Sequence, residues 1–195
     1  MKKAYSVTGI VLILIIGAFF ILRGEGDIIE STNIMAELSL TSSAFSVGES
    51  IPTVYTCDGD NTSPPLEISG VSDNAKSLVL IMDDPDIPEV VKTSRGIEKF
   101  DHWVLFNLPT NTTALAPNYS GEGVLGINSA GEAKYTGPCP PTEYEPTQHR
   151  YIFQLYELDT ELDLTSKATQ EEVRNAMGGH ILQKVELMGL YDRNN

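Results

Sequence analysis

Basic residues are scarce in this chain of 195 residues, since 13 lysines and arginines stand against 27 aspartates and glutamates. The formal net charge of −14 argues against a nucleic-acid binder and against attraction to anionic lipid headgroups, because both need a basic surface. Cysteine is also rare, and two cysteines exclude a disulfide-dense scaffold. Hydrophobic residues make up 41% of the chain, so a packed core must carry the fold and disorder throughout is not expected.

The sequence has one long hydrophobic run, from Ala4 to Leu22, which contains no charged residue and follows two lysines. As a helix it would rise about 28 Å, close to the thickness of the hydrocarbon core of a bilayer. A cleaved signal peptide and an uncleaved signal anchor both fit residues 1–23. No small-x-small cleavage site follows the run, which favours the anchor.

The two N-terminal lysines should stay in the cytoplasm, so the rest of the chain should lie outside it. We therefore expect a single-pass protein of the cell membrane with an extracytoplasmic C-terminal domain, or a secreted protein if residues 1–23 are removed. Contact with the membrane should involve this N-terminal helix only. Residues 24–43 are interpreted as a tether, although residues 34–40 could pair as a first strand, and the folded domain is expected at residues 44–195.

Strands dominate the predicted secondary structure of this domain. Short apolar, aromatic and β-branched runs between Pro- and Gly-rich connections are typical of strands, and they lie at residues 78–82, 102–108, 151–158 and 184–190. Strands and helices do not alternate, which argues against a Rossmann or TIM-barrel fold. The pattern predicts an all-β-dominated, antiparallel two-sheet architecture with a minor helix.

One helix is clearly marked. Residues 169–172, Thr-Gln-Glu-Glu, form a capping box. Val173, Ala176 and Met177 follow with the spacing of one apolar stripe. The glycine pair at 178–179 is typical of a helix C-terminus, so the sequence predicts a short helix that starts just after Thr169.

Three clusters hold nearly all the side chains that could carry chemistry. The first is Asp-Asp-Pro-Asp-Ile-Pro at 83–88, where prolines stiffen a run of carboxylates; a solvated turn is the simpler alternative. The second is His102, which lies in a run of core residues and is either a core histidine or a binding group. The third joins Gly-Pro-Cys-Pro-Pro at 137–141 with Gln-His-Arg-Tyr at 148–151.

The third cluster suits a small oxyanion. If His149, Arg150 and Tyr151 open a strand, side-chain alternation places His149 and Tyr151 on one face and turns Arg150 away. Gly137 has no side chain and is expected to have a free amide, so its backbone can approach a ligand. A strand end with a buried ring and a surface arginine is the alternative.

Several motifs occur together and in a fixed order along the chain. They are Asp84-Pro85-Asp86-x-Pro88, His102-Trp103-Val104, Asn107-x-Pro109, Gly137-Pro138-x-Pro140-Pro141, His149-Arg150-Tyr151 and Leu155-Tyr156-x-Leu158-Asp159, with Tyr55-Thr56-Cys57-Asp58-Gly59 and Gly179-His180-Ile181-Leu182 at the two ends. From about Phe45 to Tyr191 the chain thereby resembles the phosphatidylethanolamine-binding protein family. The resemblance is to the bacterial and archaeal branch of its Raf kinase inhibitor-like group.

This resemblance implies an antiparallel Greek-key β-sandwich with one or two short helices, here preceded by the membrane helix. It also implies a small pocket that binds phosphate, phosphorylated headgroups or similar anions. Carried over motif by motif, the ligand-binding residues are Asp84, Pro85, Asp86, His102, Gly137, Pro138, His149 and Tyr151, with Asp86 and Trp103 as walls or supports. The function implied is a small-anion-binding module that regulates a partner, a protease or a signalling protein. Inhibition of an extracytoplasmic serine protease is the alternative.

An acidic chain that binds an anion must attract it through local donors. The Gly137 amide, the imidazoles of His102 and His149 and the hydroxyl of Tyr151 are the candidates. Protonated histidine forms charge-assisted hydrogen bonds, which are about twice as strong as neutral ones. Binding of a phosphate-type anion should therefore strengthen as the pH falls through the histidine range.

A binding protein is expected rather than an enzyme. Asp84, His102 and His149 could serve a hydrolase, but the sequence contains no Gly-x-Ser-x-Gly elbow and marks no other nucleophile. The histidines and aspartates could also bind zinc, yet their spacing matches no zinc signature, and neither a metal nor a cofactor is predicted. An even pair of cysteines in an exported domain is compatible with one disulfide between Cys57 and Cys139, and two separate buried thiols are the alternative.

Overall fold

The computed structural model describes residues 37–194. The predicted signal anchor at 1–23 and most of the predicted tether lie outside the described residues. The chain divides into two units after Asn33, and every described residue belongs to the second. Within residues 37–194, no helix has the length and hydrophobicity that crossing a membrane requires.

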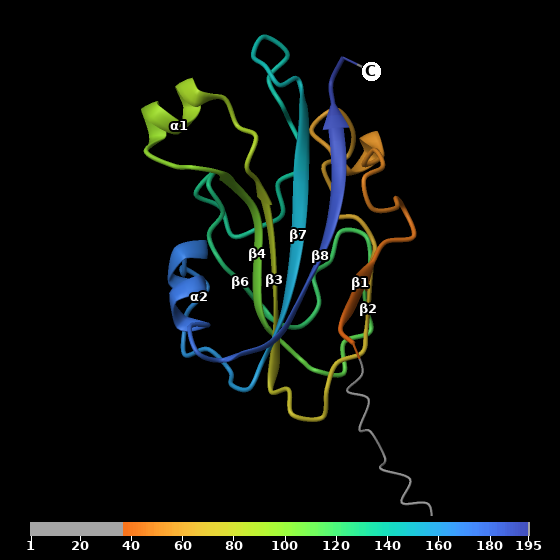
Figure 1. The fold of residues 1–195 in the computed structure, drawn as a ribbon, viewed down its shortest axis with the longest axis vertical. Coiled ribbons are helices and arrows are strands. Elements are labelled where there is room, and N and C mark those ends of the chain that lie inside the picture. Colours follow the sequence, from red (N-terminus) through yellow and green to blue (C-terminus); the bar gives the residue numbers. More distant parts are fainter. Residues whose placement is uncertain (1–36, 195) are drawn as a thin grey trace, which may run out of the picture. The chain divides into compact units, whose positions relative to one another are not determined.

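The described residues form two antiparallel sheets, as Figure 1 shows. The larger sheet has the strand order β6 (Val124–Leu125), β4 (Phe100–Leu108), β3 (Ser77–Asp84), β7 (Gln148–Leu158) and β8 (Ile181–Asp192). The smaller sheet has the order β1 (Ser39–Thr41), β2 (Leu66–Ser69) and β5 (Ala114–Leu115). Two short α-helices, α1 (Glu89–Arg95) and α2 (Gln170–Ala176), and one 3-10 helix, η1 (Thr53–Tyr55), complete the fold.

The prediction of a mostly β fold with two antiparallel sheets is confirmed. The four predicted strands lie within β3, β4, β7 and β8, whereas the short strands β2, β5 and β6 were not individually predicted. Strand β1 falls inside the range interpreted as a tether, in the stretch that could pair as a first strand. Leu38 and Leu40 are buried there, so the packed domain begins before residue 44.

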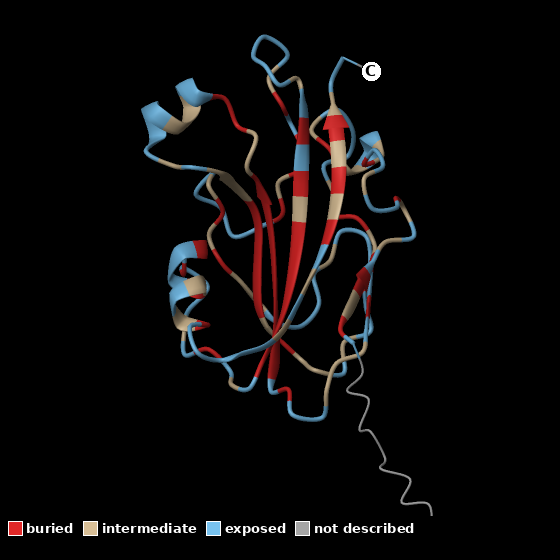
Figure 2. Cartoon of the chain, in the orientation of Figure 1, coloured by how far each residue is buried: buried red, intermediate tan, exposed pale blue. Residues whose placement is uncertain are grey.

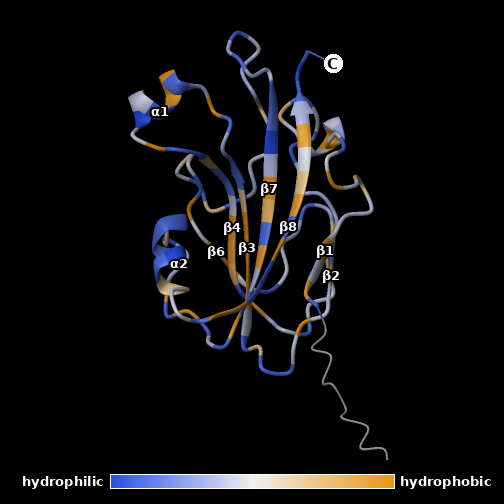
Figure 3. Cartoon of the chain, in the orientation of Figure 1, coloured by the Kyte–Doolittle hydropathy of each residue, from blue (hydrophilic) through white to orange (hydrophobic). Residues whose placement is uncertain are grey.

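Strand β3 and most of β4 and β7 are buried on both faces of the larger sheet, which explains the continuous apolar runs in these strands. One core lies between the two sheets and includes Leu66, Leu80 and Phe153. The other lies on the opposite face of the larger sheet, where Val173 and Met177, from α2 and just after it, cover Ile81. Figure 2 shows β3 and β4 buried along most of their length, and Figure 3 shows hydrophobic colours on these strands and hydrophilic colours on much of α2.

Helix α2 begins as predicted. The Thr169 hydroxyl accepts a hydrogen bond from the Glu172 amide, and the Glu172 carboxylate accepts one from the Thr169 amide at 2.8 Å. Helix α1 was not predicted as an element of its own. It buries no residue and has no side-chain cap, so it lacks the apolar stripe by which helices are recognised in a sequence.

Candidate functional site

A pocket of about 180 Å³ opens at one end of the larger sheet. Its walls come from the end of β3 and from α1, from the starts of β4 and β7, and from the segment that precedes β7. The apolar lining residues are Ile87, Pro88, Val91, Phe100, Pro140 and Pro141. The polar lining residues are Asp84, His102, Thr136, Gly137, Cys139 and His149.

Antiparallel pairing explains why residues so far apart in the sequence meet here. Strand β3 pairs with both β4 and β7, so the last residues of β3 lie beside the first residues of the other two strands. Asp84 ends β3, His102 is the third residue of β4 and His149 is the second residue of β7. The three clusters that the sequence singled out therefore share one rim of the sheet.

A β-bulge directs His102 into this site. Met82 faces Trp103 across the β3–β4 pair, but the next residue, Asp83, faces Asp101. His102 is thus the extra residue on β4, and a bulge of this kind re-aims a side chain. Its ring lies between those of Phe100 and Tyr151, at centroid distances of 4.8 and 5.2 Å.

Asp84 and His149 form a buried pair. Nδ1 of His149 lies 2.7 Å from Oδ2 of Asp84, and both side chains are almost inaccessible to solvent. Oδ1 of Asp84 accepts a hydrogen bond from the Asp86 amide at 2.8 Å, which fixes the carboxylate. Nε2 of His149 is buried and has no hydrogen-bond partner among residues 37–194. A ligand in the pocket is the natural partner for this nitrogen.

A backbone carbonyl fixes the tautomer of His102, as Asp84 fixes the ring of His149. Its Nδ1 lies 2.7 Å from the Thr136 carbonyl oxygen, which can only accept, so Nδ1 carries the proton. Burial lowers the pKa of His102, and the nearby carboxylate of Asp84 offsets only part of this effect. The ring is therefore held in its neutral form, with Nε2 as an acceptor.

Tyr151 lies behind the pocket rather than on its surface. Its side chain is completely buried and its hydroxyl has no hydrogen-bond partner in the described part of the chain. Burial raises the pKa of Tyr151, and the negative charge of Asp84 raises it further, so the phenol keeps its proton. Its ring stacks on that of His149 at a centroid distance of 6.4 Å. Tyr151 thus packs beside the buried histidines without lining the pocket.

Asp86, Pro85 and Pro138 do not line the pocket. The Asp86 carboxylate accepts hydrogen bonds from Nε and Nη2 of Arg150 at 2.8 and 2.6 Å, and from the Arg150 amide at 2.9 Å. These bonds to the guanidinium hold the pKa of Asp86 below its usual value. Arg150 faces away from the pocket, as alternation along the strand predicted, and Asp86 supports the rim through it and through its amide bond to Asp84.

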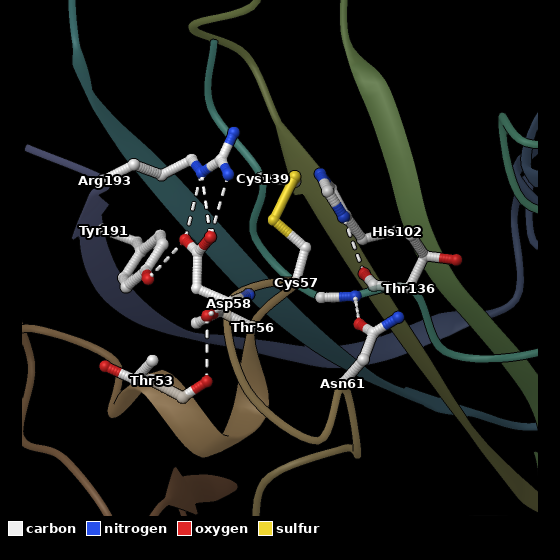
Figure 4. Close-up of a disulfide and its surroundings, with 11 residues drawn as sticks. Thr53, Thr56, Cys57, Asp58, Asn61, His102, Thr136, Cys139, Tyr191 and Arg193 are labelled. Atoms are coloured by element: carbon white, nitrogen blue, oxygen red, sulfur yellow. Dashed lines mark hydrogen bonds and ion pairs between the residues drawn. A yellow bond between two sulfur atoms is a disulfide. The ribbon is translucent and has the colours of Figure 1, made fainter. Parts of the chain in front are cut away.

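The interpretation of Gly137 as a free amide is wrong. Its N–H donates a hydrogen bond to Oδ1 of Asn61 at 2.7 Å (Figure 4 shows Asn61 in this region). A Cβ at this position would lie 2.4 Å from the Tyr55 carbonyl oxygen, so glycine is needed for a close approach to the loop that follows η1. Asn61 was missed as a site residue, since only its position shortly after the Cys-Asp-Gly motif could have drawn attention to it.

Cys57 and Cys139 form a disulfide with a Cα–Cα distance of 5.4 Å, which is one of the two alternatives that the sequence left open (Figure 4). The Cys57 amide also donates to the Pro138 carbonyl at 3.0 Å. The loop after η1 is therefore attached to the pocket wall by both a covalent bond and hydrogen bonds. In the described part of the chain, no group of three or more His, Cys, Asp and Glu side chains is arranged to hold a metal ion.

Comparison with known proteins identifies the family. The model of the phosphatidylethanolamine-binding protein family matches residues 41–192. A UPF0098 protein of Methanothermobacter thermautotrophicus is 46% identical over 162 residues, which cover 80% of this chain and 99% of the relative. A UPF0098 protein of Chlamydia trachomatis is 43% identical over 157 residues, or 80% of this chain and 100% of the relative.

Solved structures agree with this result. A crystal structure of CT736 from Chlamydia trachomatis, described as a putative homologue of this family, has 42% sequence identity and a TM-score of 0.74 over 81% of this chain and 99% of that one. The structure of YbcL from Escherichia coli, described as a new member of the mammalian family, has 27% identity and a TM-score of 0.70, covering 80% of this chain and 99% of that one. The chain belongs to the phosphatidylethanolamine-binding protein family. Within it, the chain falls in the bacterial and archaeal branch of UPF0098 proteins.

Proposed function

We propose that the pocket binds a small phosphate-type anion, either free or as a phosphorylated headgroup. The observation that carries this proposal is the unpartnered Nε2 of His149 in a pocket-lining ring whose other nitrogen is fixed by Asp84. An oxygen of the ligand that meets this nitrogen satisfies a buried polar atom, and leaving such an atom unsatisfied costs about 1–3 kcal/mol.

The fixed tautomers determine how an anion can be held. With both Nδ1 atoms donating to protein oxygens, the neutral rings of His102 and His149 present only acceptors to the pocket. A phosphate oxygen is also an acceptor, so binding requires a proton at the interface, on the ligand or on His149. The affinity should therefore rise as the pH falls.

The same geometry favours binding over hydrolysis. Of the two pocket-lining side chains that carry a hydroxyl or a sulfur, Thr136 accepts a hydrogen bond from Asn128 at 3.0 Å and Cys139 is oxidised. Neither is hydrogen-bonded to an imidazole, as an activated nucleophile would be.

The predicted signal anchor at residues 1–23 is the basis for the proposed location. It would hold the domain outside the cytoplasm at the cell membrane, where a protease or a signalling partner can recognise the occupied pocket.

Isothermal titration with inorganic phosphate at about pH 5.5 and about pH 8 tests the proposal. We expect binding to be about tenfold tighter at the lower pH. His149→Gln should weaken it about 10- to 100-fold, because the hydrogen bond to Nε2 is lost. Phosphoethanolamine and vesicles that contain phosphatidylethanolamine distinguish a free anion from a headgroup.

His180→Gln is the matched control. His180 also pairs with an aspartate, Asp159, at 2.8 Å, but about half of its side chain is exposed and it does not line the pocket. This variant should bind phosphate as the unmodified chain does. Equal affinities at the two pH values, or a His149→Gln variant that binds phosphate as tightly as the unmodified chain, would refute the proposal.

A further inference from the structure

The disulfide lies at the wall of the pocket and not in the core. Cys139 lines the pocket and is solvent-exposed, whereas Cys57 is only partly exposed. Thiol–disulfide exchange proceeds by attack of a thiolate on one of the two sulfurs, and its rate depends on access to that sulfur. Cys139 is the more exposed of the two residues and hence the expected target for a thiol that approaches from solvent.

Consecutive residues of the segment 136–139 contact the pocket and the loop after η1. The Thr136 carbonyl fixes Nδ1 of His102, and the Gly137 amide donates to Asn61. The Pro138 carbonyl accepts from the Cys57 amide, and Cys139 is bonded to Cys57 itself. The carbonyl that sets the tautomer of His102 is thus three residues from the disulfide (Figure 4), on a segment that the disulfide and two hydrogen bonds link to the loop after η1.

We propose that Cys57–Cys139 is a thiol-exchange site that controls the pocket. A thiolate attacks Sγ of Cys139 and forms a mixed disulfide with it, and Cys57 leaves as a thiolate that takes a proton from water. A second thiol from a dithiol or from glutathione then attacks the mixed disulfide and releases Cys139, so that two thiols of the reductant are oxidised to one disulfide and the protein disulfide is reduced to two thiols. The substrate class is a low-molecular-mass thiol or a protein dithiol.

Opening the bond changes the pocket in two ways. An adduct on Cys139 occupies part of the pocket wall. The fully reduced segment loses its covalent link to the loop after η1 and keeps its hydrogen bonds to that loop, the bond from the Thr136 amide to the His102 carbonyl and the bond from Asn128 to the Thr136 hydroxyl. The Thr136 carbonyl is then less firmly held against His102. This effect on the pocket rests on the proposed anion binding. We expect phosphate to bind about three- to tenfold more weakly, which corresponds to the loss of about one well-positioned hydrogen bond.

Exchange is tested without any pocket ligand. The folded full-length chain is incubated with reduced glutathione, quenched with acid, and mapped by mass spectrometry of its peptides. We expect the adduct on Cys139 in clear excess over Cys57, at a rate that stays constant when urea is added below the unfolding transition. An adduct mainly on Cys57, or a rate that rises steeply with urea, means that the bond opens only after unfolding and overturns the proposal.

Single-cysteine variants provide a matched pair. Cys57→Ser leaves the Cys139 thiol free and Cys139→Ser leaves the Cys57 thiol free, in chains that equally lack the disulfide. Alkylation by iodoacetamide should be faster in Cys57→Ser, and phosphate should slow it there but not in Cys139→Ser. Equal rates for the two thiols overturn the assignment of Cys139 as the attacked residue.

The coupling to the pocket has its own readout. Nitrogen NMR of the histidine rings should show the His102 resonances shifting on reduction with dithiothreitol, while those of His180 stay in place, and the titration should show weaker phosphate binding. If phosphate binds the oxidised and reduced chains equally, the control of the pocket is refuted while the proposed function stands. If phosphate fails to bind even the oxidised chain, the proposed function fails, and the adduct map and the His102 shift still decide the exchange site.

Discussion

Asp101 has a strongly raised pKa, although it does not line the pocket. It faces Asp83 across the β3–β4 pair as a result of the bulge at His102. Asp83 is ion-paired with Lys99 and, at 3.2 Å, with Arg174. Oδ1 of Asp101, in contrast, is buried and has no hydrogen-bond partner among residues 37–194. Burial raises the pKa of Asp101 to about 6, against the lowering effect of Lys99. A carboxylate at this position should therefore destabilise the fold at neutral pH.

The Asp101→Asn variant tests this prediction. Because the pKa of the folded state lies above the usual 3.8, the folded protein holds this proton more tightly than the unfolded chain, and the free energy of unfolding falls as the pH rises from about 4 to about 6. Removing the charge should stabilise the protein by about 1–2 kcal/mol at pH 7, after a discount for partial solvent screening, and should have little effect near pH 4. Urea unfolding at both pH values measures the difference.

The exposed Asp73 provides the control for Asp101. Asp73→Asn should change the free energy of unfolding by less than about 0.5 kcal/mol at either pH. If Asp101→Asn instead lowers the free energy of unfolding at pH 7, the prediction is wrong. The buried carboxylate is then stabilised by Lys99 and Arg174.

Helix α2 depends on its N-terminal cap and on the core beneath it. Seven residues are too few for a helix to be stable alone in water, so the capping box and the burial of Val173 hold it in place. Thr169→Ala removes the hydroxyl that accepts from the Glu172 amide and should lower the free energy of unfolding by about 1 kcal/mol. Chemical denaturation of the variant measures this loss.

Ser94→Ala in α1 is the comparison for Thr169. The Ser94 hydroxyl donates to the Val91 carbonyl within its own helix and is exposed, so its removal should cost less than about 0.5 kcal/mol. If both variants lose the same stability, the capping box contributes nothing beyond an ordinary surface hydroxyl.

The disulfide constrains the chain as a whole. Cys57 and Cys139 are separated by 82 residues, so the bond removes much of the conformational freedom of the unfolded chain. In the chain-entropy description, a loop of this length corresponds to about 4 kcal/mol. The double variant Cys57→Ser/Cys139→Ser should unfold at a correspondingly lower urea concentration. An unchanged midpoint would mean that the hydrogen bonds from Cys57 and Gly137 suffice to hold the two loops.

The net charge also acts on the molecule as a whole. The chain carries a formal charge of −14, so its long-range field repels an anionic ligand. Salt screens this field beyond about 8 Å at physiological ionic strength, whereas the buried histidines act at contact distance. Phosphate binding in the proposed site thus depends on local protonation and not on electrostatic steering.

Much of the fold follows from patterns local in the sequence. The apolar runs around Leu80, Leu105 and Phe153 form long strands because their side chains can be buried on both faces of a sheet, and the Thr169–Glu172 box starts a helix because its hydrogen bonds are made within four residues. The same applies to Arg150, which strand alternation alone turns away from the pocket. The order of the motifs was sufficient to indicate the family, and the antiparallel strands explain why those motifs meet at one rim.

The details of the site depend on contacts that no local pattern contains. Asn61 is 76 residues away from the Gly137 amide to which it binds, and Asp84 is 65 residues away from the His149 ring that it orients. The bulge that turns His102 into the pocket arises from the register between two strands, which neither strand encodes alone. The sequence by itself thus determined the four long strands, helix α2 and most of the candidate residues. The tertiary structure decided which of their atoms remain available to a ligand, because that depends on which partners the distant segments bring within hydrogen-bonding distance.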